Sequence, residues 1–214
     1  LKEDRKKFAK KFDLILNIKD LKNWPGLIKK GSVGKSSLWR PSCDGCEYLK
    51  IKPKHQNRFS VFIPISTGCN NACTYCAVPL TRGPLICRKA EDVLKEARGA
   101  IKNGAKEIWL LGQNVNDYRS KSKIKNQKSK IINFAGLLKM IDRIKGNFWI
   151  RFTSPNPADF SDTLIEAMAK CKKTTPYLNL PLQSGDDKIL KKMNRRYTVK
   201  EYKNLVKKIS SAFR

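Results

Sequence analysis

Residues 61–76 read VFIPISTGCNNACTYC, and this stretch decides the fold. The run 61–65 has the length and apolar character of a buried strand. A loop with the cysteines Cys69, Cys73 and Cys76 follows directly, in the spacing C-x-x-x-C-x-x-C. Three thiolates on one short loop can ligate three irons of a cubane [4Fe–4S] cluster. The fourth iron then has no protein ligand, so that a small molecule can bind there.

Downstream of this loop, strands and helices are expected to alternate. Helices are predicted over 90–102, 134–144, 161–170 and from Thr198 onward, and strands over 107–111, 148–153 and 177–182. This alternation predicts a parallel sheet with right-handed connections. A complete (β/α)₈ barrel takes about 250 residues. We therefore expect an α/β fold with a partial, TIM-like (β/α) barrel, whose functional residues follow the carboxyl ends of the strands.

The N-terminal part of the chain has a different pattern. Residues 1–30 read as helix, strand and helix, and we expect them to be the end of an incomplete N-terminal α/β domain. Residues 31–58 are punctuated by Gly, Ser and Pro and predict a connector. Residues 59–214 then form the domain that holds the cysteine loop. The first residue is not Met and Arg214 falls inside a predicted helix, so we expect a fragment with both domains incomplete.

Composition restricts the compartment and the partners. The chain has 46 Lys and Arg against 18 Asp and Glu, a net charge of +28, which favours a polyanion such as nucleic acid. The alternative explanation of this charge is a genome that favours lysine codons, without any polyanionic partner. No apolar stretch approaches the roughly 20 residues of a membrane span, and no secretory signal is evident. Seven cysteines, an odd number at close spacings, indicate a reducing cytoplasm and metal ligation rather than disulfides.

A zinc site is the alternative interpretation of the cysteines. Cys43 and Cys46 form a second C-x-x-C pair, which together with Cys73 and Cys76 matches a Cys₄ zinc ribbon. Such a ribbon would indicate a nucleic-acid-binding module without catalysis, and it would leave Cys69 unused. Incidental thiols in a connector are the other interpretation of Cys43 and Cys46.

Four further segments carry a family resemblance. They read AVPLTRGP at 77–84, LLGQNVNDY at 110–118, LPLQSGDD at 180–187 and LKKMNRRYT at 190–198. With the cysteine loop, they resemble the radical S-adenosylmethionine (SAM) superfamily, and within it the MiaB-type tRNA methylthiotransferases. The resemblance is strongest over 59–203. The segment 112–116, GQNVN, distinguishes this type from related methylthiotransferases that act on another tRNA base or a ribosomal protein, which stay open as alternatives.

The resemblance implies an activity and its cofactors. A [4Fe–4S] cluster on the three cysteines would bind SAM and cleave it to a 5′-deoxyadenosyl radical, for methylthiolation of N6-isopentenyladenosine next to the anticodon. A second [4Fe–4S] cluster is expected only in the full-length protein, so this chain alone is expected to be incomplete for sulfur transfer. The implied partners are the tRNA anticodon loop and an electron-donor protein, and the full-length protein is expected to be a monomer.

Cofactor-contacting residues are predicted by the resemblance and by position after strands. Tyr75, before the third cysteine, would lie near the adenine of SAM, and Gly112 would let the backbone approach its amino end. Arg151 lies within a predicted strand, and a buried arginine needs a partner, for which the SAM carboxylate is a candidate. Polar residues expected to bind the ribose or carboxylate are Gln113, Asn114, Ser154 and Gln183. No side chain is assigned a catalytic role.

The segment 119–130 is the main candidate for tRNA contact. It holds six basic residues in twelve and no acid, and these are Arg119, Lys121, Lys123, Lys125, Lys128 and Lys130. Phosphate contact is one interpretation and a solvated insert is the other. A second basic patch is formed by Lys191, Lys192, Arg195 and Arg196.

Overall fold

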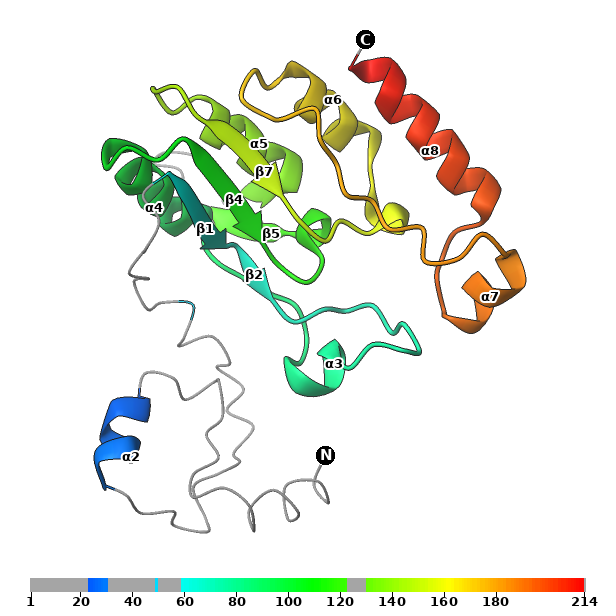
Figure 1. The fold of residues 1–214 in the computed structure, drawn as a ribbon, viewed down its shortest axis with the longest axis horizontal. Coiled ribbons are helices and arrows are strands. Elements are labelled where there is room, and N and C mark those ends of the chain that lie inside the picture. The colour runs from blue at the N-terminus through cyan, green and yellow to red at the C-terminus, as the bar shows by residue number, and fades with distance from the viewer. Residues whose placement is uncertain (1–22, 31–48, 50–58, 123–129, 214) are drawn as a thin grey trace. The chain divides into compact units, whose positions relative to one another are not determined.

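The computed structural model describes residues 23–30, 49, 59–122 and 130–213 (Figure 1). The chain divides into two compact units, Leu1–Lys54 and His55–Arg214. In the first unit, helix α2 (Trp24–Lys30) agrees with the second helix predicted within residues 1–30. The elements predicted for 1–22, and Cys43 and Cys46, lie outside the described residues. The division into an incomplete domain, a connector and a cluster-bearing domain stays a prediction.

A parallel sheet forms the centre of the second unit. Its order is β1 (Ser60–Pro64), β4 (Glu107–Leu111) and β7 (Trp149–Phe152), with Ile108 paired to Val61 on one side and to Ile150 on the other. A further parallel bridge joins Ile150 to Thr174. The strands predicted over 61–65, 107–111 and 148–153 are confirmed to within one residue at each end, because each is a short apolar run between polar turns.

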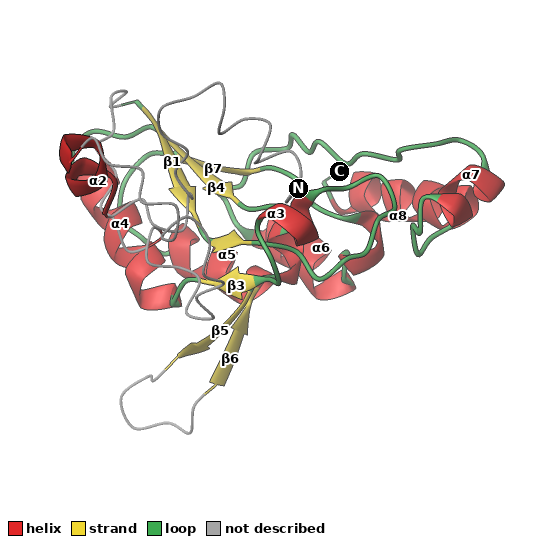
Figure 2. Ribbon diagram, turned by 90° about the horizontal axis from the view of Figure 1, so that it is seen from below, coloured by secondary structure: helices red, strands yellow, loops and turns green. Residues whose placement is uncertain are grey.

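Helices cover one face of this sheet (Figure 2). They include α4 (Ala90–Lys102), α5 (Phe134–Asp142) and α6 (Asp162–Lys170), with α7 (Asp187–Lys192) and α8 (Val199–Ala212) beyond them. Alternate strand residues point into the core under the helices, and the fully buried ones include Ile63, Ile108, Leu110 and Ile150. A parallel sheet with helices on one face confirms the α/β class and the partial barrel. The sheet is open in the described part of the chain.

Local capping signals explain where two helices begin. The Ser161 side chain accepts a hydrogen bond from the Leu164 N–H, which starts α6. Thr198 and Glu201 form a capping box at the start of α8, with both reciprocal bonds present. Gly104, with φ +95°, follows the end of α4 as predicted.

The predicted strand over 177–182 is wrong. In the described structure this segment belongs to no strand. Pro176 precedes it and Pro181 lies within it, and a proline lacks the N–H that a sheet ladder requires. Its carbonyls pair with side chains instead: the Tyr202 hydroxyl donates to Leu180 O at 2.7 Å. The sheet is instead extended at Thr174, three residues before the predicted strand begins.

The loop after β4 contains a hairpin that the sequence did not predict. A 3₁₀ turn, η3 (Val115–Asp117), leads into β5 (Arg119–Ser122), which pairs antiparallel with β6 (Lys130–Asn133). Tyr118 anchors the base of the hairpin, because its fully buried hydroxyl donates to Arg88 O at 2.8 Å. None of the helices among the described residues has the length and apolar character to cross a membrane.

Candidate metal centre and cofactor site

The cysteine loop lies between β2 (Ser66–Thr67) and α3 (Val78–Thr81), just past the carboxyl end of β1. Strand β3 (Ile86–Cys87) pairs antiparallel with β2 and closes the loop at its base. Gly68 enters the loop with φ +75°, and a Cβ on it would lie 2.1 Å from the carbonyl oxygen of Pro84. Only glycine therefore fits there. The next residue, Cys69, donates its N–H to Gly83 O at 3.2 Å.

The three cysteines of this loop are free thiols and partly buried. Each sulfur has one N–H donor: Asn71 N on Cys69 at 3.4 Å, Arg195 Nη1 on Cys73 at 3.4 Å and Val78 N on Cys76 at 3.5 Å. Hydrogen bonds to sulfur stabilise ligating thiolates and tune the clusters that they hold. The three cysteine sulfurs, each with its N–H donor, therefore fit an iron–sulfur cluster.

A single-ion site is a different arrangement. Among the described residues, no three His, Cys, Asp or Glu side chains converge on one metal ion. A zinc site requires such convergence, because its Zn–S bonds are about 2.3 Å long. A cubane cluster does not require it, because each cysteine ligates a different iron.

Loops after other strands contact the cysteine loop. Asn114, after β4, is 2% exposed and donates to Asp159 Oδ2 at 2.8 Å. The same carboxylate oxygen accepts from Asn71 Nδ2 at 3.4 Å. Asp159 ends the 3₁₀ turn η4 (Pro157–Asp159), which follows β7. Asp159 was not predicted from the sequence, because Asp159 lies 88 residues from Asn71 and no local pattern links the two residues.

Two buried polar atoms beside this network have no hydrogen-bond partner among the described residues. They are Ser66 Oγ and Asn114 Oδ1. Gly112 lies against the first, and a Cβ on Gly112 would be 2.5 Å from Ser66 Oγ. Buried polar atoms are normally paired, so these two atoms mark unmet hydrogen-bonding capacity beside the ends of β2 and β4. The predicted position Gly112 lies against Ser66, which was not predicted from the sequence.

The other predicted cofactor residues lie in more open surroundings. Tyr75 is 51% exposed, and burial of its ring raises the pKa of its hydroxyl although nearby Arg195 lowers it. Gln113 is exposed. Ser154 and Gln183 both have a left-handed backbone, with φ 58° and 74°. Such strain concentrates at functional sites.

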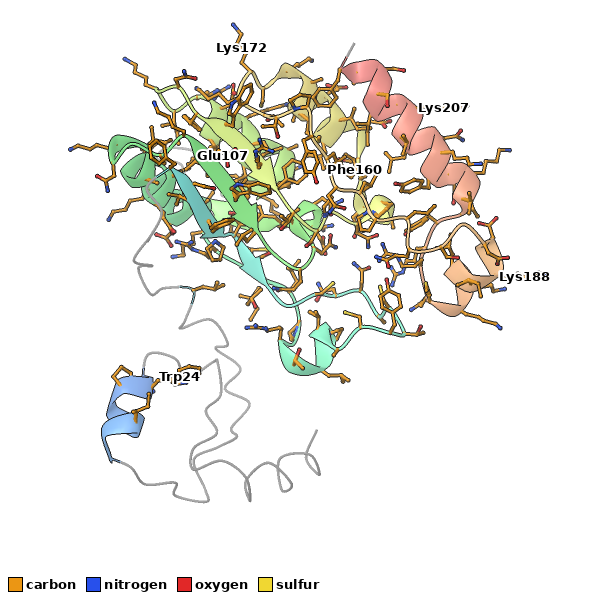
Figure 3. The ribbon with its side chains drawn as sticks, in the orientation of Figure 1. Trp24, Glu107, Phe160, Lys172, Lys188 and Lys207 are labelled. Atoms are coloured by element: carbon orange, nitrogen blue, oxygen red, sulfur yellow. The ribbon has the colours of Figure 1, made fainter. Side chains whose placement is uncertain are left out.

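Arg151 has an internal partner. Its Nε lies 3.0 Å from Oε1 of Glu107, the first residue of β4, which is labelled in Figure 3. Its guanidinium lies over the Trp109 ring at 5.3 Å. Glu107 is at the amino end of its strand, whereas the cysteine loop is at the carboxyl ends. The carboxylate that a strand arginine needs is therefore supplied by the protein in this structure, and contact with SAM stays a prediction.

Three of the six predicted tRNA-contacting residues lie in the strands of the β5–β6 hairpin. Arg119 is exposed and lies 3.3 Å from Asp117, and Lys121 is exposed on β5. Lys130 begins β6. The remaining three, Lys123, Lys125 and Lys128, lie outside the described residues. The hairpin base contacts the ribbon that closes the cysteine loop, because Arg119 N donates to Cys87 Sγ at 3.4 Å.

Comparisons with known proteins agree with this geometry. The chain is 39% identical over 202 residues to the tRNA-2-methylthio-N(6)-dimethylallyladenosine synthase of Ruegeria pomeroyi, which covers 94% of this chain and 45% of that protein. It is 46% identical over 150 residues to the Clostridium perfringens protein of the same name. That match covers 70% of this chain and 32% of the Clostridium perfringens protein. The chain thus spans less than half the length of these relatives.

A solved structure shares the fold. It is the cobalamin-dependent S-adenosylmethionine radical enzyme OxsB with aqua-cobalamin and S-adenosylmethionine bound, with a TM-score of 0.55 at 13% identity. The match covers 72% of this chain and 22% of OxsB. The family model described as the radical SAM superfamily matches residues 63–214. Fold, cysteine loop and family model agree, and the chain belongs to the radical SAM superfamily.

Proposed function

We propose that the protein containing this chain is a radical SAM tRNA methylthiotransferase that modifies N6-isopentenyladenosine next to the anticodon. One observation carries the proposal: a C-x-x-x-C-x-x-C loop with an N–H donor on every sulfur follows β1. The shared name of relatives that are 39–46% identical supports the choice of tRNA as substrate.

In this proposal Cys69, Cys73 and Cys76 ligate a [4Fe–4S] cluster. When bound, that cluster supplies the electron that cleaves SAM into a radical. Ser66 Oγ and Asn114 Oδ1 offer unpaired acceptors beside it, and they would orient the polar end of SAM. The absence of a side chain at Gly112 lets the backbone pass close to Ser66 Oγ, because a Cβ there would lie 2.5 Å from that atom. Asp159 accepts a hydrogen bond from the Asn114 amide nitrogen and so fixes which way this amide faces.

Other predicted residues would surround the same ligand. Tyr75 is the aromatic side chain of the loop and would lie near the adenine. Gln113, Ser154 and Gln183 would bind ribose or carboxylate groups, and Arg151 is retained as a candidate for the carboxylate. Gln113 and Ser154 follow β4 and β7, at the strand ends where ligands of such folds bind, whereas Tyr75 and Gln183 lie in segments that carry the family resemblance.

The β5–β6 hairpin would bind the RNA backbone. Its basic residues, with the charge of +28 on the whole chain, would attract phosphates. The target adenine must leave its stack to reach the site. An anticodon loop, being partly single-stranded, makes that step less costly. The proposal includes a low-potential electron-donor protein, a second [4Fe–4S] cluster in the full-length protein, a monomeric state and a cytoplasmic location.

The modified base in tRNA tests the proposal. We would express the full-length gene, as wild type or Cys69→Ala, in bacteria that lack their own enzyme, and analyse tRNA nucleosides by mass spectrometry. The expected result is methylthio-isopentenyladenosine with the wild type and only isopentenyladenosine with Cys69→Ala. A methylthio group on a different tRNA base, or none with a well-expressed wild type, would contradict the proposal.

A further inference from the structure

The segment after α7 is hydrogen-bonded to the middle of the cysteine loop, and Figure 1 draws α7 beside that loop. Three hydrogen bonds join them: Thr74 N to Met193 O at 3.2 Å, Thr74 Oγ1 to Lys192 O at 3.0 Å and Asn194 Nδ2 to Ala72 O at 2.8 Å. Asn194 has a left-handed φ of 55°. These contacts surround Cys73 and place the next residue, Arg195, against it.

The Arg195 guanidinium is held from two sides. Nη1 donates to Cys73 Sγ at 3.4 Å, and Nε donates to the Tyr197 hydroxyl at 3.0 Å. Tyr197 is 8% exposed, and its hydroxyl donates onward to Leu182 O at 2.8 Å. The guanidinium also lies over the Tyr197 ring at 5.1 Å. Its direction toward Cys73 is therefore fixed by a buried side chain.

The surroundings of the Arg195 charge differ from those of three other described arginines. Among the described residues, no Asp or Glu oxygen lies within ion-pair distance of its nitrogens, whereas Arg88, Arg119 and Arg151 each have one. An arginine side chain does not lose its proton in a protein, so the guanidinium stays charged. Cys73 Sγ, 3.4 Å from Nη1, would carry negative charge as a cluster ligand.

We propose that Arg195 is a positioning residue that places a fixed positive charge beside Cys73 and thereby raises the reduction potential of the cluster. A positive charge close to a ligating sulfur favours the reduced cluster, because that state is more negative than the oxidised one. In that step one electron passes from the low-potential donor, which is oxidised, to the cluster, which is reduced, and no bond at Arg195 changes. This inference rests on the proposed function for the presence of the cluster.

The neighbouring basic residues differ from Arg195. Lys191, Lys192 and Arg196 are exposed and remain candidates for phosphate contact. Arg195 is partly buried against Cys73 and Tyr197, so it is not available to RNA in the same way. Arg196→Gln is therefore a matched control, because it removes an adjacent positive charge that does not touch the loop.

A redox titration of the full-length, anaerobically reconstituted protein tests the proposal. The EPR signal that changes when SAM is added reports this cluster alone. In Arg195→Gln, the ratio of reduced to oxidised cluster at the wild-type midpoint should fall about tenfold, which is 59 mV for a one-electron couple. In Arg195→Lys this ratio should fall less, because lysine retains the positive charge. In Arg196→Gln the ratio should equal that of the wild type.

The outcomes separate this proposal from the proposed function. If Arg195→Gln titrates like the wild type, the proposal is overturned, even where its iron content falls, since a structural role alone lowers iron without shifting the potential. If the wild type has no SAM-sensitive signal, the proposed function fails first. Should Arg195→Gln not hold a cluster, Tyr197→Phe replaces it: a smaller fall in the same ratio supports the proposal, and an unchanged curve overturns it.

Discussion

Asn114 donates a 2.8 Å hydrogen bond to the carboxylate of Asp159. The two residues follow different strands, β4 and β7, and the same carboxylate oxygen reaches Asn71 in the cysteine loop. One acidic side chain therefore connects the loops that follow three neighbouring parallel strands. These loops hold the predicted cluster ligands and the unpaired acceptors beside them.

Asp159→Ala should loosen this connection. The Asn114 amide would lose its partner while buried, which costs about 1–3 kcal/mol, and the cysteine loop would lose its contact through Asn71. We expect a lower free energy of unfolding in urea and less iron per chain after reconstitution. Asp162→Asn is the control: the Asp162–Lys208 ion pair is exposed, so its loss should lower the free energy of unfolding by under about 1 kcal/mol. Wild-type iron content and stability in Asp159→Ala would contradict this role.

Gly68→Ala should disrupt the start of the cysteine loop. The left-handed backbone costs alanine about 1–2 kcal/mol, and the new Cβ would also collide with the Pro84 carbonyl. We expect a marked loss of iron, measured by chemical analysis of reconstituted protein. Gly99→Ala in α4 is the control: its Cβ meets nothing within 4 Å, so it should stabilise the chain by about 0.5–1 kcal/mol. Equal behaviour of the two variants would refute the argument.

Asp117→Asn should change how stability depends on pH. Burial raises the pKa of Asp117, nearby Asp159 raises it further, and Arg119 partly offsets both. A carboxyl whose folded pKa exceeds its unfolded pKa contributes stability below the unfolded value, about 3.9, and this is lost as pH rises through the folded pKa. The free energy of unfolding of Asp117→Asn relative to the wild type should therefore rise with pH above about 4.

Urea unfolding of the apoprotein at a series of pH values measures this difference. The wild type and Asp117→Asn should be most similar at the acid end, where the wild-type carboxyl is protonated. A difference that stays flat, or that falls as pH rises, would show that the Asp117 pKa is not raised in the folded chain.

Replacing the lysines of segment 119–130 with glutamine should weaken the salt dependence of tRNA binding. The five are Lys121, Lys123, Lys125, Lys128 and Lys130. Each phosphate contact on single-stranded RNA contributes about 0.7 to the slope of log K against log salt. A matched control replaces five exposed lysines elsewhere, namely Lys95, Lys102, Lys106, Lys139 and Lys145. If both variants have the same slope, the hairpin is not a specific phosphate-binding element.

Much of the fold could be predicted because its signals are local. Strands β1, β4 and β7 are short apolar runs, and α6 and α8 begin at a capping serine and a capping box. The segment 177–182 was mistaken for a strand because its apolar residues were given more weight than Pro176, just before it, and Pro181, within it. The β5–β6 hairpin was missed because its polar residues have little strand propensity, and it depends on pairing and on the buried Tyr118.

The candidate site was only partly predictable for a related reason. The cysteines were recognised by their spacing and Gly112 by its place after a strand. The contacts that hold them are long-range: Asp159 lies 88 residues from Asn71, and Arg195 lies 122 residues from Cys73. No periodicity in the sequence joins such pairs. Their partnership follows from the parallel sheet, which brings the carboxyl ends of separate strands to one edge.

The most direct test of the central claim is cofactor cleavage by the anaerobically reconstituted full-length protein, as wild type and Cys69→Ala. With a strong reductant and SAM, the wild type should contain a cluster of about four irons on this loop and release 5′-deoxyadenosine. Cys69→Ala should lose that cluster and the cleavage. Wild-type cleavage by Cys69→Ala, or a colourless wild type that holds one zinc ion, would contradict the account.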